Sequence, residues 1–124
     1  MDAIKSYRDL RVYQKAFNAS ITIYELSKNF PKEELYSLTS QIRKSSRSVS
    51  ANIAEAFRRR KYPKSFSNKL NESEAEASET QNWLDYLLKH NFINFNTHKE
   101  LFLEYENIIG MLVNMQRTSE KWKI

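Results

Sequence analysis

Apolar residues recur three and four positions apart along almost the whole chain, the spacing of amphipathic helices. Pro31, Pro63 and the polar stretch 91–97 interrupt this pattern and divide it into four segments. The predicted helices span residues 6–29 and 33–60, a stretch that begins after Pro63, and a stretch that begins at Thr97. Long helices joined by short loops run up and down beside one another. The sequence therefore predicts an all-α, antiparallel up-down-up-down four-helix bundle, with residues 1–124 as one domain.

Capping residues and core stripes refine these boundaries. Ser6 with Asp9, and Thr97 with Glu100, have the spacing of helix-starting capping boxes. Pro63 suits the first turn of the third helix, where its missing N–H has no cost. The predicted core positions of the last three helices are Leu35, Leu38, Ile42, Ser45, Ser46, Val49, Ile53, Ala56 and Phe57, then Phe66, Leu70, Ser73, Ala77, Thr80, Leu84, Leu87 and Leu88, then Leu101, Tyr105, Ile108, Leu112, Met115, Ser119 and Trp122.

The first predicted helix is apolar on two opposite sides. One stripe consists of Leu10, Tyr13, Phe17, Ile21 and Tyr24, and the other of Val12, Ala16, Ala19, Ile23 and Leu26. An outer helix of a bundle needs only one apolar face, and large apolar patches are seldom left in water. We expect the second stripe to be an oligomer interface. The alternative is that it packs under a neighbouring helix or terminal segment of the same chain.

The composition excludes several classes of protein. A single Gly argues against glycine-rich phosphate loops, dinucleotide-binding folds and tight hairpins. The absence of Cys removes disulfides and thiolate chemistry and is compatible with a reducing compartment. No apolar run reaches the roughly 20 residues that a bilayer span needs. We expect a cytoplasmic protein, because the chain has no Cys and no membrane span. We also expect that it is not an enzyme and takes no cofactor, because no paired catalytic groups are visible.

The charge is concentrated in the first half of the chain. Residues 1–64 carry 14 Lys and Arg against 6 Asp and Glu, a net +8, whereas residues 65–124 carry 6 against 9, a net −3. A basic half in a chain with a pI near 9.4 indicates a polyanionic partner such as RNA or DNA. The alternative is that the two halves neutralise each other across helix pairs.

The candidate nucleic-acid-binding residues lie on the second predicted helix and directly after it. They are Arg43, Lys44, Arg47, Arg58, Arg59, Arg60, Lys61 and Lys64, to which Lys5, Arg8, Arg11 and Lys15 add further charge. Such cations contact phosphates in a salt-sensitive way, and Tyr62 within the run is placed to stack on an exposed base. Cations at a helix C-terminus also complement the helix dipole, so a solvated basic loop is the alternative.

Acidic residues line one flank of the third predicted helix. Glu72, Glu76 and Glu79 are spaced three and four apart, and Trp83 and Tyr86 continue the row. We favour ion pairs with Arg43 and Arg47, in the same chain or the next subunit, over a metal site. Di-iron bundles use Glu-x-x-His motifs, and neither histidine has a Glu three residues before it. We therefore expect no bound metal.

Several motifs together resemble a known family. They are Tyr7–Ala16, Phe30–Glu34, Leu38–Arg43, Asn52–Glu55 and Glu76–Asp85. These segments look like the four-helix-bundle proteins encoded in intervening sequences of bacterial 23S ribosomal RNA genes, also labelled S23 ribosomal proteins. The resemblance implies assembly into a homopentameric ring. It extends to the accessory variability protein of diversity-generating retroelements, a basic pentamer that associates with nucleic acid and a reverse transcriptase.

The chain departs from this family at two positions. Ala56 stands where relatives commonly have Gly, and Tyr13 where they commonly have Trp. Among the matching positions, we expect Asn52 to be a buried amide that ties helices together and Glu55 to pair with Arg58 or Arg59. The function that follows is a non-enzymatic homo-oligomer that binds nucleic acid through its basic surface. The alternative is an oligomeric scaffold for a protein partner.

Overall fold

A computed structural model describes residues 4–124, which are almost entirely helical and contain no strand. The long helices are α1 (Arg11–Ser27), α2 (Ser40–Phe57), α3 (Pro63–Lys89) and α4 (Phe95–Arg117). Short turns accompany them: the 3-10 turns η1 (Tyr7–Asp9), η2 (Lys32–Glu34) and η4 (Ser119–Trp122), and η3 (Leu35–Thr39), a π-helical turn that leads directly into α2. The predicted four helices are present.

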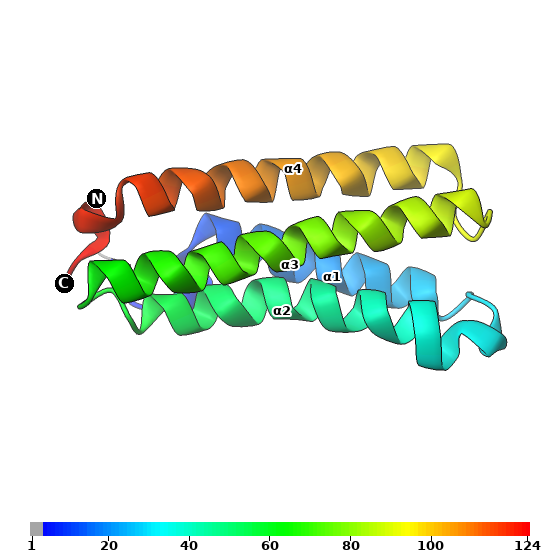
Figure 1. The fold of residues 1–124 in the computed structure, drawn as a ribbon, viewed down its shortest axis with the longest axis horizontal. Helices are drawn as coiled ribbons and strands as arrows, with labels where there is room; N and C mark the ends of the chain where they lie inside the picture. Colours follow the sequence, from blue (N-terminus) through cyan, green and yellow to red (C-terminus); the bar gives the residue numbers. More distant parts are fainter. Residues whose placement is uncertain (1–3) are drawn as a thin grey trace.

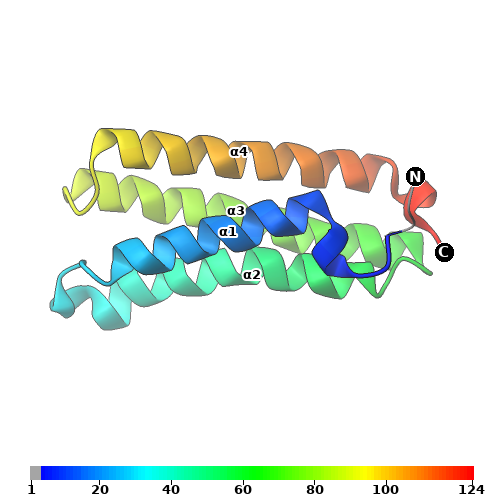
Figure 2. The same cartoon turned by 180° about the vertical axis from the view of Figure 1, so that it is seen from behind.

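The four long helices lie side by side, and the chain reverses direction at each connection (Figure 1). The α2–α3 turn lies at the same end of the bundle as the start and end of the described chain, and the other two connections lie at the opposite end (Figures 1 and 2). The pairs α2–α3 and α3–α4 make the most extensive contacts, and α1 packs on α2 more than on α4. Within residues 4–124, no helix is both long and apolar enough to cross a membrane.

The buried apolar side chains of all four helices form one core. Most predicted core positions are buried, including Ile42, Phe66 and Tyr105, each with at most 1% of its surface exposed. Leu88, Ser119 and Trp122 are only partly buried, and Leu35 is exposed, with 39% of its surface in solvent. It lies in the π-helical turn, whose wider winding changes the angle between successive residues and moves Leu35 off the stripe.

The helix starts agree only in part with the predictions. Ser6 and Asp9 form the predicted capping box, but they cap η1, because extended backbone at Leu10 separates this turn from α1. The prediction of a cap at Thr97 is wrong. Asn94 caps α4 instead, and its side-chain oxygen accepts a hydrogen bond of 2.8 Å from the Thr97 backbone N–H. Asn is a stronger N-cap than Thr, which explains the earlier start.

Small hydroxyl residues join α2 to α3 inside the core. The hydroxyl oxygens of Thr80 and Ser45 lie 2.8 Å apart in a buried hydrogen bond. The Ser73 hydroxyl donates to the Val49 carbonyl at 2.7 Å. Buried polar groups need such partners, and the small side chains let the two helices approach closely. The close approach predicted from small residues in the middle of the second helix is therefore present.

The oligomer interface predicted on the first helix is wrong. Val12, Ala16, Ala19 and Ile23 are at most 5% exposed, and Leu26 is partly buried, all within their own chain. The predicted alternative, packing under neighbouring helices of the same chain, is correct. The apolar surface left in water lies on the opposite side of α1.

Candidate nucleic-acid interface

The basic residues of the second helix and its turn form two separate groups. We call Arg43, Lys44 and Arg47 the α2 cluster, and Arg58, Arg59, Arg60, Lys61 and Lys64 the turn cluster. Fifteen residues of helix between Arg43 and Arg58 correspond to about 22 Å along the axis, at 1.5 Å per residue. The α2 cluster lies in the first half of α2, whereas the turn cluster extends from the C-terminal end of α2 to the start of α3. The predicted basic surface is therefore two patches.

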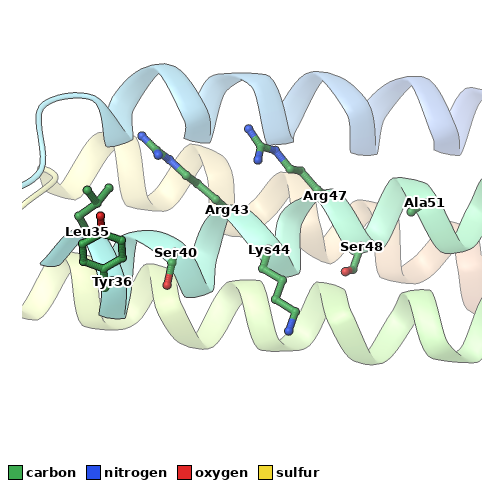
Figure 3. A pocket seen from close by; sticks show the side chains of 8 residues that line it. All are labelled: Leu35, Tyr36, Ser40, Arg43, Lys44, Arg47, Ser48 and Ala51. Atoms are coloured by element: carbon green, nitrogen blue, oxygen red, sulfur yellow. The ribbon is translucent and has the colours of Figure 1, made fainter.

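The two arginines of the α2 cluster reach toward α1, as Figure 3 shows. Their guanidinium carbons lie 4.9 Å (Arg43) and 5.3 Å (Arg47) from the centre of the Tyr24 ring, and Arg43 Nε donates to Ser27 Oγ at 2.7 Å. Lys28 Nζ lies 5.1 Å from the same ring centre. The π electrons of Tyr24 attract these cations. The ring and the Ser27 hydroxyl thus orient positive charge without neutralising it.

The ion pairs predicted between these arginines and the acidic flank of the third helix are absent among the described residues. Only Lys44 points toward α3 (Figure 3), near Glu76. The pKa of Glu76 is raised, chiefly by burial and then by the charge of Glu79, against the lowering effect of Lys44. Within one chain the prediction is wrong, because the arginines lie on the side of α2 that faces α1; pairing with the next subunit stays a prediction.

The α3 carboxylates have other partners. Lys69 Nζ lies 2.8 Å from Glu72 and 3.4 Å from Glu55, so it joins α3 to α2. The indole N–H of Trp83 donates to Glu79 at 3.0 Å. Within residues 4–124, no three His, Asp or Glu side chains are grouped as a metal site.

Two predicted roles of family-motif residues are wrong. Glu55 pairs with Lys69 rather than with Arg58 or Arg59, because its side chain is directed toward α3. Asn52 is half-buried, and its amide donates to the Ser48 carbonyl at 2.9 Å, one turn earlier in the same helix. This hydrogen bond lies within α2 and does not connect two helices.

The α2 cluster lines an open depression of about 580 Å³. Its other lining residues, shown in Figure 3, are Leu35, Tyr36, Ser40, Ser48 and Ala51. Tyr36 is the most exposed large apolar side chain of the described residues, with 92% of its surface in solvent. Sequence reasoning missed Tyr36, because its placement depends on the π-helical turn.

The turn cluster is held by contacts with neutral groups. The Arg60 guanidinium lies 3.6 Å from the centre of the Phe57 ring, and its Nε donates to the Phe57 carbonyl at 2.9 Å. Partial burial, and then the charge of Arg58, lower the pKa of Arg60. Arg59 donates to Ser65 Oγ at 3.2 Å.

None of the eight basic residues in the two clusters makes an ion pair with a carboxylate of the described chain. Lys15, predicted to add to the basic surface, differs from them. Its Nζ lies 3.0 Å from Glu104, so the contact joins α1 to α4 and neutralises the charge. The clusters therefore keep their charge available for an external anion, whereas Lys15 does not.

Comparisons with known proteins agree with the helical architecture. The family model for the 23S rRNA-intervening sequence proteins matches residues 8–114. A crystal structure from Bacteroides thetaiotaomicron VPI-5482, described as a protein with unknown function from the S23 ribosomal protein family, is similar with a TM-score of 0.77 and 28% sequence identity. The similarity covers 86% of this chain and 95% of that chain. No functionally curated protein matches significantly.

Proposed function

We propose, for a chain that belongs to the 23S rRNA-intervening sequence protein family, that its antiparallel bundle binds RNA or DNA through the α2 cluster and the turn cluster. The role is non-enzymatic and cytoplasmic: the basic side chains hold backbone phosphates and transform nothing. The similar crystal structure is that of a protein with unknown function, so the proposal rests on the surface of this chain.

The observation that carries the proposal is that all eight cations lack a carboxylate partner in residues 4–124. Aromatic rings and hydroxyl groups orient several of them and leave their positive charge unneutralised. Such cations displace the counterions of a nucleic acid when they contact its phosphates, and this displacement favours binding at low salt.

The test is a titration of a fluorescently labelled oligonucleotide at about 50 mM and about 200 mM salt. With six or more phosphate contacts, affinity should fall by about 10³-fold or more between these salt concentrations. The triple variant Arg58→Ala, Arg59→Ala, Arg60→Ala should bind more weakly and show a shallower salt dependence.

The matched control removes three exposed lysines outside both clusters, through Lys32→Ala, Lys89→Ala and Lys99→Ala. It lowers the net charge by the same amount but should retain most of the affinity. Equal losses in the two triple variants would contradict a localised interface. Absence of binding at the lowest salt would contradict nucleic-acid binding altogether.

A second candidate is an oligomeric scaffold for a protein partner, such as a reverse transcriptase. It is favoured by the outer side of α1, where Phe17 and Ile21 are 44% and 47% exposed and the Tyr13 and Phe17 rings stack 5.9 Å apart. Burial of this side between copies would remove apolar surface from water. Light scattering should then give several times 14.8 kDa, up to the predicted pentamer. A monomeric mass would contradict the scaffold.

A further inference from the structure

A second depression adjoins the one lined by the α2 cluster. It has a volume of about 400 Å³ and is lined by residues of η3, α2 and α3, among them Tyr36, Trp83, Tyr86 and His90. Tyr36 lines both depressions. The same exposed ring therefore borders a cationic surface on one side and an aromatic surface on the other.

The aromatic surface is a row of rings along α3. The ring centres of Trp83 and Tyr86 lie 5.7 Å apart, and those of Tyr86 and His90 lie 6.1 Å apart. The hydrogen bond from the Trp83 indole to Glu79 fixes the first ring of the row. Tyr86 has 49% of its surface exposed, so part of the row is open to a ligand.

The two depressions differ in charge. The first contains Arg43, Lys44 and Arg47 and no carboxylate, which favours anionic groups. The second contains no Lys or Arg, and it includes Glu34, whose carboxylate accepts a hydrogen bond of 3.0 Å from the Ser37 hydroxyl. A carboxylate repels phosphate but accepts hydrogen bonds from the N–H groups of nucleobases. Phosphates therefore suit the first depression and bases the second.

The backbone supports the same division. Tyr36 lies in the π-helical turn η3, and single π-helical turns occur frequently at functional sites. A tyrosine ring with 92% of its surface in water contributes little to the stability of the fold. An exposed ring beside unneutralised cations is instead the combination with which proteins bind single strands: cations follow the backbone and rings stack on bases.

We propose that the two depressions together bind single-stranded nucleic acid, with phosphates on the α2 cluster and unpaired bases stacked on Tyr36 and Tyr86. This inference rests on the proposed function and adds the strandedness of the ligand and the place of its bases. Duplexes are disfavoured because their base faces are covered by neighbouring base pairs.

The test compares one labelled strand with the duplex of the same sequence, for the wild type and for Tyr36→Ala. The wild type should bind the single strand more tightly than the duplex. Tyr36→Ala should weaken single-strand binding between about fivefold and about 150-fold, the range for one base–aromatic stack, and leave duplex binding unchanged. Tyr36→Phe keeps the ring and should retain the wild-type affinity.

Phe95→Ala is the matched control, since Phe95 is 64% exposed but lines neither depression. It should leave the preference for single strands unchanged. If Tyr36→Ala has no effect, or weakens single strand and duplex equally while salt-dependent binding persists, this inference is wrong and the proposed function stands. If the wild type binds neither form at low salt, both are wrong. Circular dichroism of each variant should match the wild type, because the substituted side chains lie outside the core.

Discussion

The two apolar sides of α1 differ in their exposure to solvent. The inner side, with Val12, Ala16, Ala19 and Ile23, is at most 5% exposed, whereas Phe17 and Ile21 on the outer side are nearly half exposed. Both sides have helical periodicity, so hydrophobicity alone does not distinguish them. Side-chain volume does: two alanines let α1 approach its neighbours closely, and an aromatic ring at either place would hold the helices apart. When a helix has two apolar stripes, the one with the smaller residues is the better candidate for the core.

We expect the largest loss of stability when a charge is placed on the inner side of α1. Val12→Asp buries a carboxylate where the wild-type side chain is 1% exposed and belongs to the apolar core. We expect a loss of at least about 3 kcal/mol in the free energy of unfolding, because an uncompensated buried charge is strongly unfavourable. Urea denaturation followed by circular dichroism measures this loss. A stability close to that of the wild type would show that this side is not the core side.

A smaller loss should follow from added volume on the inner side. Ala16 is fully buried, so Ala16→Leu forces three further carbon atoms into a packed space. We expect a destabilisation of about 1–3 kcal/mol with helical content retained. Ala75→Leu on the exposed surface of α3 is the control and should leave the urea midpoint nearly unchanged. If Ala16→Leu were equally silent, α1 would pack loosely on its neighbours.

The pH dependence of stability tests how completely the centre of the core is buried. Tyr105 is fully buried, its hydroxyl has no protein hydrogen-bond partner among the described residues, and burial raises its pKa well above the usual value. Above a pH of about 10, the unfolded chain loses this proton while the folded chain keeps it, so stability falls with rising pH. The loss from this group should reach about 1.4 kcal/mol per pH unit.

Tyr105→Phe removes this dependence. Its stability relative to the wild type should therefore increase as the pH is raised from 9 toward 11, in paired urea titrations. At neutral pH the variant should be as stable as the wild type or more so, because a buried hydroxyl without a partner is lost. A constant difference between the two proteins across this pH range would contradict the burial of Tyr105.

The smallest effect on stability is expected on the outer side of α1. Phe17→Asp should change the free energy of unfolding by only about 0.5 kcal/mol, because its side chain is already 44% exposed. If copies associate through this side, the mass measured by light scattering should fall. A large loss of stability in Phe17→Asp would remove the distinction between the two sides of α1.

The architecture was predictable because long helices repeat the same signal many times. The positions Ile42, Leu70 and Leu112 follow from spacing alone and are fully buried. Local departures were not predictable. The extended backbone at Leu10 and the π-helical turn at Leu35–Thr39 shift the helix starts, and neither leaves a trace in the periodicity.

The candidate interface was predictable in its residues but not in its geometry. Sequence reasoning identified the basic residues of the second helix, yet it directed Arg43 and Arg47 toward acidic residues of the third. Their contacts with Tyr24 depend on how α1 lies against α2, which helical spacing does not specify. Tyr36 was missed because exposure of an aromatic residue depends on backbone winding.

The buried hydroxyl contacts between α2 and α3 have a consequence for molecular recognition. If α3 slid along α2 by one turn, Thr80 would lose its hydrogen bond to Ser45, and the buried Ser73 hydroxyl would lose its hydrogen bond to the Val49 carbonyl. The two helices are therefore locked in a single register. Since α2 bears the cations and α3 bears the aromatic row, the span between them is preorganised, and a ligand need not expend binding energy to set it.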